Sequence, residues 1–222
     1  MYPSIQLGNQ ILRSMFMSTM GCKGMKAAFL VENGFCEREL MQAQSALSEK
    51  GIDCRIVSSN VGLIKAWNEL KDPSGSDWGE GYAVDFSLDK AVPSDFDMLV
   101  IPGGTRSIEK LKIEGAVKSF VSGFLNTGKP VVAYNSAVSL LMHLSLLSGY
   151  SVAAKDQLCD TVKGAGARCA APEFVVSKNL VTLSRFRNVE QNIQAAVEAI
   201  VTGKPYEKVV SSDNMPSSHK AA

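Results

Sequence analysis

The stretch that decides the fold is Lys129-Pro130-Val131-Val132-Ala133-Tyr134-Asn135-Ser136-Ala137-Val138-Ser139-Leu140-Leu141. A short apolar strand runs here without a loop into an apolar helix. Such a bend exposes one side chain beside the unpaired N–H groups of the helix start, where many α/β hydrolytic enzymes hold a nucleophile. The residue expected at the bend is Asn135, whose amide is neither basic nor nucleophilic. The sequence therefore predicts a hydrogen-bonding group at the position where such enzymes hold their nucleophile.

Strands and helices alternate on both sides of this stretch. Apolar runs of strand length are typical of strands covered on both faces, and apolar residues at helical spacing predict the helices between them. Strands are expected at residues 26–31, 53–58, 97–101 and 131–134, and helices at residues 37–50, 114–126 and 137–147. The alternation predicts a doubly wound α/β sandwich with a mostly parallel central sheet and helices on both faces.

Other segments are predicted from turn residues and shorter patterns. Residues 60–78 contain a turn-forming cluster, Asp72-Pro73-Ser74-Gly75-Ser76, and are expected to leave the sheet. Alternation with period two predicts an edge strand or a hairpin arm at residues 82–88. Further elements are expected as a helix at residues 156–165, two short strands at 174–176 and 180–184, and a helix from residue 188 that ends before Gly203.

Composition limits the class of protein. The 222 residues are 45% hydrophobic and 20% charged, and the formal charge is +1, without a basic cluster that would indicate a nucleic-acid surface. Five irregularly spaced cysteines and only two histidines argue against a disulfide framework and a zinc site, so we expect neither a metal nor another cofactor. No apolar run is long enough to span a bilayer, and a cytoplasmic location is expected.

We expect one domain, over residues 26–203. Residues 1–25 contain no acidic residue and faintly resemble an organellar presequence, but they lack a sustained apolar stripe. A loosely ordered extension that the fold does not need is the better interpretation. Residues 204–222 are polar with two prolines and are predicted to form a mobile tail.

Two loops after predicted strands carry candidate ligand-binding groups. Gly103 and Gly104 follow the strand at 97–101, where paired glycines let backbone N–H groups converge on a ligand oxygen, although a tight turn is the commoner explanation. Together with the helix start at Ser136, they predict a pocket for a small anion or a carbonyl-bearing metabolite. Arg106 and Arg185 are candidates for added positive charge there.

Several stretches resemble, in order and spacing, the PfpI/ThiJ superfamily, which includes PfpI-type intracellular proteases and the parkinsonism-associated deglycase. They are Lys26-Ala-Ala-Phe-Leu-Val-Glu-Asn-Gly-Phe-Cys-Glu-Arg-Glu-Leu40, Gly81-Tyr-Ala-Val-Asp85, Asp95-Phe-Asp-Met-Leu-Val-Ile-Pro-Gly-Gly104, Gly128-Lys-Pro-Val-Val-Ala133 and Gly164-Ala-Gly-Ala-Arg168. The Phe-Asp-x-Leu-Val-x-Pro-Gly-Gly stretch is the most specific. The resemblance implies a flavodoxin-like sandwich shared with class I glutamine amidotransferases, and a homodimer.

The chain departs from this superfamily at the residues that carry its chemistry. Active members have a cysteine at the elbow, usually followed by a histidine, and a glutamate after the first strand that hydrogen-bonds the thiol. The resemblance places Asn135, Ser136 and Cys36 at these three positions. Glu32, Glu37 and Glu39 lie near Cys36 in the sequence, but carboxylates there more often favour a helix N-terminus. The resemblance therefore implies that neither a thiolate nor an activating base is present at the elbow.

Two hypotheses follow. In the first, which the sequence favours, the chain is a non-catalytic member, a pseudoenzyme, that keeps the fold and a binding pocket. The alternative is a glyoxalase-, deglycase- or hydrolase-type enzyme whose nucleophile is displaced to Cys36. This cysteine is expected to face Asn135, although a free cysteine is often only a small core residue. Whether Cys36 and Asn135 share one pocket discriminates between the two.

Overall fold

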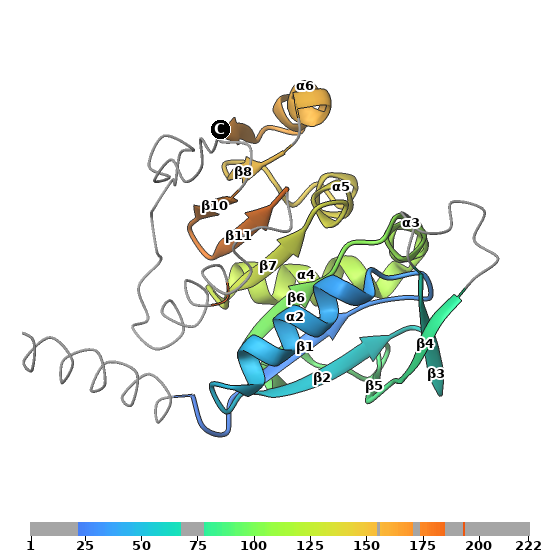
Figure 1. Cartoon of the computed structure of the whole chain (residues 1–222). Helices are drawn as coiled ribbons and strands as arrows, with labels where there is room; N and C mark the ends of the chain where they lie inside the picture. Colours follow the sequence, from blue (N-terminus) through green and yellow to red (C-terminus); the bar gives the residue numbers. More distant parts are fainter. Residues whose placement is uncertain (1–21, 68–77, 155, 171–173, 185–192, 194–222) are drawn as a thin grey trace, which may run out of the picture.

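The computed structural model describes residues 22–67, 78–154, 156–170, 174–184 and 193 (Figure 1). Its strands are β1 (Lys26–Leu30), β2 (Asp53–Ser58), β3 (Leu63–Trp67), β4 (Trp78–Ala83), β5 (Phe86–Ser87), β6 (Met98–Ile101), β7 (Val131–Tyr134), β8 (Ser151–Ala153), β9 (Arg168–Ala170), β10 (Phe174–Ser177) and β11 (Leu180–Leu183). Its helices are α2 (Glu37–Ser48), α3 (Thr105–Ile113), α4 (Gly115–Asn126), α5 (Ala137–His143) and α6 (Asp156–Gly164), with the 3₁₀ turn η1 (Pro93–Asp95).

Within the described residues, seven strands form the central sheet in the order β10-β11-β7-β6-β1-β2-β5. Every neighbouring pair in it is parallel except β10 and β11, which are antiparallel. The central parallel strands β1, β6 and β7 are mostly buried apolar runs, as strands with both faces covered require. The predicted mostly parallel α/β sheet is confirmed.

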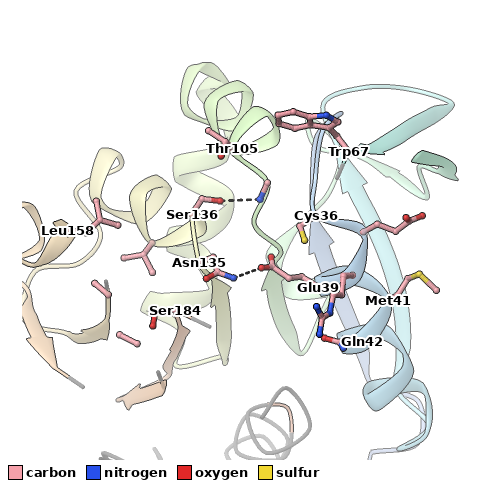
Figure 2. A pocket seen from close by; sticks show the side chains of 16 residues that line it. Cys36, Glu39, Met41, Gln42, Trp67, Thr105, Asn135, Ser136, Leu158 and Ser184 are labelled. Atoms are coloured by element: carbon pink, nitrogen blue, oxygen red, sulfur yellow. Dashed lines mark hydrogen bonds between the residues drawn. The ribbon is translucent and has the colours of Figure 1, made fainter. Parts of the chain in front are cut away.

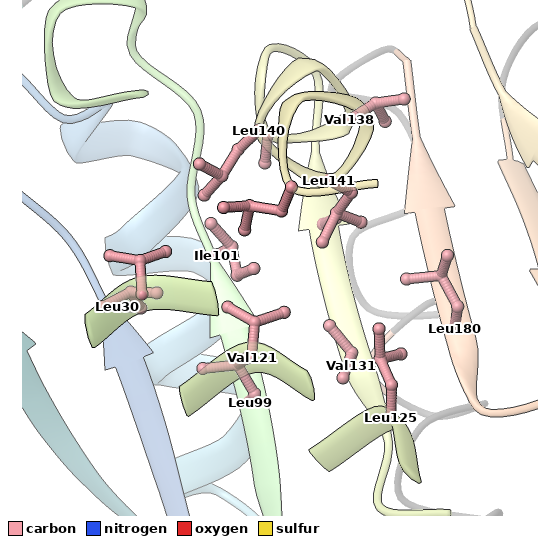
Figure 3. Close-up of a cluster of buried hydrophobic side chains, with 14 of the residues drawn as sticks. Leu30, Leu99, Ile101, Val121, Leu125, Val131, Val138, Leu140, Leu141 and Leu180 are labelled. Carbon is pink, nitrogen blue, oxygen red and sulfur yellow. The ribbon is translucent and has the colours of Figure 1, made fainter. Parts of the chain in front are cut away.

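Helices cover both faces of this sheet. On one face, α2 packs its apolar stripe of Leu40, Ala43 and Leu47 against side chains of β1, β6 and β7. On the other face, α4 and α5 enclose the larger core, where Leu99 and Val131 of the sheet belong to the same cluster as helix residues (Figure 3). Because β1, β6 and β7 are parallel, the loops that follow their carboxyl ends lie at the same edge of the sheet.

Several boundaries differ from the sequence predictions. The helix expected at residues 137–147 ends at His143, because Ser145 has a φ of 59°, which is incompatible with a continuing helix. The strand expected at residues 82–88 is divided: β4 ends at Ala83 and forms a hairpin with β3, whereas β5 extends the main sheet beside β2. The prediction missed β3 and the parallel pair β8 and β9.

Cysteine pairing also differs from the prediction. Cys159 of α6 and Cys169 of β9 form a single disulfide, whereas the sequence prediction argued against a disulfide framework. Cys22, Cys36 and Cys54 are free. Cys22 is fully buried, so the last residues of the expected N-terminal extension pack on the domain.

Other expectations fall on parts of the chain that lie outside the described residues. They are the extension over residues 1–21, the helix predicted from residue 188, Arg185 and the tail at residues 204–222. Among the described helices, none is both long and apolar enough to cross a membrane. In the same part of the chain, no group of three or more histidine, cysteine, aspartate and glutamate side chains is placed to hold a metal ion.

Candidate functional site: a carboxylate–amide pair at the elbow

Two loops at the carboxyl ends of β1 and β6 are in direct contact. The Cys36 amide donates a hydrogen bond to the Gly103 carbonyl, with 2.9 Å between N and O. Gly104 has a φ of 105°, and a Cβ on it would lie 2.4 Å from the Gly34 carbonyl oxygen and 2.7 Å from the Cys36 nitrogen. A glycine is therefore required there on both conformational and steric grounds. This packing holds the start of α2 against the loop that follows β6.

Asn135 occupies the bend between β7 and α5, as the sequence predicted. Its φ of 45° lies in the left-handed region, which asparagine tolerates better than most residues. The backbone is held by a hydrogen bond from the Asn135 amide to the Leu183 carbonyl of β11, 2.6 Å long. The Asn135 side-chain amide donates to a carboxylate oxygen of Glu39 (Figure 2).

Glu39 lies in the first turn of α2 and is 1% exposed. One of its carboxylate oxygens accepts from the Asn135 amide, and the other accepts from the Gly103 N–H. A Cβ on Gly103 would lie 2.8 Å from the second of these oxygens, so the glycine is what lets the carboxylate reach the backbone. Burial raises the pKa of Glu39 above the ordinary glutamate value, while the two hydrogen bonds lower it in part.

The expectation that the elbow has no carboxylate beside it is therefore wrong. The resemblance placed Cys36 where active members have their glutamate, but the structure brings Glu39, three residues later, to the elbow. The sequence carried a weak signal, since Glu39 was one of three glutamates considered near that loop. An acidic residue in a first helical turn is, however, usually explained by the helix dipole.

The backbone amides expected to bind an anion already have side-chain partners. Gly104 N–H donates to the Ser136 hydroxyl at 3.1 Å, and Gly103 N–H donates to Glu39. Because side chains of the chain itself occupy these donors, no ligand oxygen can accept from both glycines in this arrangement. The Gly104 amide is therefore engaged within the chain, and an anion between Gly104 and Ser136 stays a prediction.

Above the elbow lies a cavity of about 740 Å³. It is lined by Cys36, Glu37, Arg38, Glu39, Met41 and Gln42 of the α2 region, by Trp67, Gly104, Thr105, Asn135, Ser136 and Val138, and by Ala153, Ala154, Leu158 and Ser184. Cys36 and Asn135 thus share one pocket. The position agrees with the general placement of ligand sites at the carboxyl ends of parallel strands.

Cys36 is the N-cap residue of α2 and is half-buried at the pocket. Burial raises the pKa of its thiol to about 11, and the negative charge of Glu39 contributes further. The thiol is therefore neutral at physiological pH, which makes it a poor nucleophile.

The remaining predicted site residues lie beside the pocket. Gly103 is buried behind Glu39 and is not part of the lining. The guanidinium carbon of Arg106 lies 4.0 Å from the centroid of the Trp67 ring and 5.4 Å from that of Trp78, a cation–π arrangement outside the lining. Sequence reasoning missed most of the other lining residues, among them Trp67, because β3 was not predicted, and Gln42 and Ser184, because nothing local distinguishes them from surface polar residues.

The fold and site define an α/β sandwich with a strand-to-helix elbow and a carboxylate from a neighbouring loop beside it. A model of the DJ-1/PfpI family matches residues 25–199, so this chain belongs to the DJ-1/PfpI family, and the PfpI/ThiJ resemblance is confirmed.

Similar proteins include two deglycases. The chain is 28% identical over 160 residues to "Protein/nucleic acid deglycase 2" of Escherichia coli, which covers 72% of this chain and 88% of the relative. It is 28% identical over 158 residues to "Deglycase PfpI" of Pyrococcus furiosus, which covers 71% of this chain and 89% of the relative.

Solved structures agree on the fold. A ThiJ/PfpI domain protein from Brachyspira murdochii superposes with a TM-score of 0.69 at 18% identity, covering 81% of this chain and 98% of that chain. Oxidized DJ-1 of Toxoplasma gondii gives a TM-score of 0.64 at 17% identity, covering 81% and 97%. At these identities the structures support the fold alone.

Proposed function

We propose that this chain is a DJ-1/PfpI family member that binds a small carbonyl-bearing metabolite in the pocket above Asn135 without covalent thiol chemistry. The observation that carries the proposal is the pair of Asn135 and Glu39. The elbow position holds an amide that is hydrogen-bonded to a buried carboxylate, so it offers hydrogen-bonding groups rather than a nucleophile.

The other nucleophilic side chains of the pocket support the same proposal. Burial raises the pKa of the Cys36 thiol to about 11, so the neutral thiol predominates at pH 7. The Ser136 hydroxyl accepts from Gly104, and both oxygens of Glu39 already accept hydrogen bonds from other groups. None of these hydrogen bonds runs from the Ser136 hydroxyl or the Cys36 thiol to the Glu39 carboxylate, so neither nucleophilic side chain is paired with that base among the described contacts.

The direct test is an activity assay with the purified full-length chain. We expect no consumption of methylglyoxal, no peptidase activity and no glutaminase activity above a heat-denatured control. Asn135→Ala and Cys36→Ser serve as matched variants, one at the elbow and one across the pocket. Turnover in the wild type that either substitution abolishes would overturn the proposal.

A second candidate function, catalysis through Cys36, rests on the position of this thiol in the same pocket as Asn135. It requires a reactive thiolate. Iodoacetamide labelling over a pH series, with peptide mapping to assign the site, should give an apparent pKa for Cys36 well above the ~8.5 of a free thiol. Cys54, whose pKa burial also raises to about 11, is the matched control within the chain. An apparent pKa of Cys36 below 8 would instead favour the displaced nucleophile.

We also propose that the chain acts as a cytoplasmic homodimer, following the family resemblance. Sedimentation velocity of the purified chain tests the dimer: a monomer at tens of micromolar would contradict it.

A further inference from the structure

Two polar atoms of the pocket residues are buried without a hydrogen-bond partner. Among the described residues, the side-chain oxygen of Gln42 and the hydroxyl of Ser184 are both in this state, and both residues line the cavity. A buried polar atom that is left unpaired destabilises the fold, so a native structure rarely retains one without a reason. Rotation of the Gln42 terminal amide or of the Ser184 hydroxyl toward the cavity would let each oxygen form a hydrogen bond with a ligand bound there.

These two residues come from different sides of the pocket. Gln42 lies on α2 three positions after Glu39, on the same side of the helix, whereas Ser184 directly follows β11. Figure 2 shows the pair of Asn135 and Glu39 between them. A ligand that satisfies both oxygens must therefore extend across the elbow, over the carboxyl ends of the strands.

The chemistry of the two oxygens selects the polar groups of this ligand. The amide oxygen of Gln42 only accepts, so it requires an O–H or N–H donor, and the Ser184 hydroxyl can donate or accept. Hydroxyl groups satisfy both. The backbone donors of Gly103 and Gly104 are engaged within the chain, so they are not free to bind an anionic ligand.

Apolar side chains complete the lining. Val138 and Leu158 line the cavity, as does Met41 of α2. Such surfaces pack against the C–H groups of a carbon chain rather than against water. The volume of about 740 Å³ is within the range of small-molecule sites and exceeds what a three-carbon compound needs.

We infer that the pocket binds a neutral, polyhydroxylated carbon chain longer than three carbons, with one hydroxyl on Gln42 and another on Ser184 across the elbow. The inference rests on the proposed function and narrows its ligand class: the carbonyl-bearing metabolite is an open-chain hydroxylated compound. Gln42 and Ser184 act as specificity-determining residues, which select hydroxyl groups over apolar ends and over charged groups.

The experiment uses xylitol as the probe, with 1,5-pentanediol, glycerol and inorganic phosphate for comparison. Binding is followed by amide chemical shifts in ¹H–¹⁵N spectra of the full chain. We expect xylitol to shift resonances of residues around Asn135 and Ser184, and to bind at least tenfold more tightly than glycerol or pentanediol. Phosphate should leave those resonances unchanged.

Matched variants separate the roles. Gln42→Met preserves the side-chain length and removes the acceptor, and Ser184→Ala removes the hydroxyl. Each substitution should weaken xylitol binding about tenfold. Each variant should also unfold at a temperature equal to or higher than that of the wild type, because an unpaired polar atom is removed. Gln44→Met, on the same helix but outside the lining, should change neither. Absence of xylitol-dependent shifts, or affinity unaffected by both pocket variants, overturns the inference. Methylglyoxal turnover that depends on Asn135 overturns the proposed function instead, whatever xylitol does.

Discussion

Two buried glutamates, Glu32 and Glu39, stand seven residues apart in the chain and differ in how fully their carboxylates are hydrogen-bonded. Each is 1% exposed. Glu32, after β1, accepts from the Ser58 hydroxyl, from the Ser59 amide and hydroxyl at 2.7 and 2.6 Å, and from the Asn60 side chain. Glu39 accepts from two donors and lines the cavity.

The difference separates a structural carboxylate from one available to a ligand. Four donors from the end of β2 surround Glu32, and its own backbone N–H donates to the Ser107 hydroxyl at 2.8 Å, so it links β1, the loop after β2 and α3. Glu39 has unused acceptor capacity, and burial raises its pKa. A carboxylate that is buried but incompletely satisfied marks the functional site better than burial alone.

The largest expected effect on stability comes from removing the carboxylate of Glu32, which accepts hydrogen bonds from four donors. Glu32→Ala leaves the hydroxyl, amide and side-chain donors of the β2 loop without an acceptor, so we expect the free energy of unfolding to fall by about 3–5 kcal/mol. Urea unfolding followed by circular dichroism measures it. Glu109→Ala, on the exposed side of α3, is the control and should change stability by no more than about 0.5 kcal/mol. A loss below about 1 kcal/mol at Glu32 would remove the distinction between the two glutamates.

Replacing Asn135, the hydrogen-bond partner of Glu39, is expected to have a smaller effect on stability. Asn135→Ala places a less tolerant residue at a φ of 45° and removes the hydrogen bond to Glu39, so stability should fall by about 2 kcal/mol. Asn135→Gly removes the same hydrogen bond without the left-handed strain, and should recover about 1 kcal/mol of that loss. Chemical unfolding of both variants tests this. Equal stabilities of the two would indicate that strain at the elbow contributes nothing.

The sequence predicted the central strands well because buried parallel strands are continuous apolar runs bounded by turn residues. The strand at residues 53–58 and the strand at 131–134 are confirmed with the predicted bounds. The strand β3 and the first part of β4 were missed because glycines at 79 and 81 weaken the strand pattern, and the pairing of β3 with β4 lies outside the main sheet.

The site was predicted only in part. Asn135 could be assigned because the elbow is local in sequence, and the whole bend lies within one strand–helix junction. The partners of Glu39 lie 64 and 96 residues away, so only the packing of separate loops reveals them. The same holds for the anion site: the glycine motif was identified, but no local pattern shows that Ser136 and Glu39 use its N–H groups.

The last prediction concerns pH, where the effect is graded rather than a single step. Because the pKa of Glu39 is raised in the folded chain, the unfolded chain releases this proton at a lower pH than the folded chain does. Between the ordinary glutamate pKa and the raised one, the unfolded state therefore binds fewer protons, and stability falls as pH rises through this window and then levels. Each unit of pKa difference corresponds to about 1.4 kcal/mol. Glu39→Gln removes this proton but keeps an amide whose oxygen can accept from the Gly103 N–H and whose NH2 group can donate to the Asn135 side-chain oxygen once that amide turns over. We expect the unfolding free energy of the wild type, relative to that of Glu39→Gln, to decrease as pH rises above about 4. Urea unfolding at closely spaced pH values measures this difference.

A relative stability that instead rises with pH would contradict this prediction. It would mean that the hydrogen bond from Asn135 stabilises the charged carboxylate more than burial disfavours it, and Glu39 would then resemble Glu32 as a structural anchor.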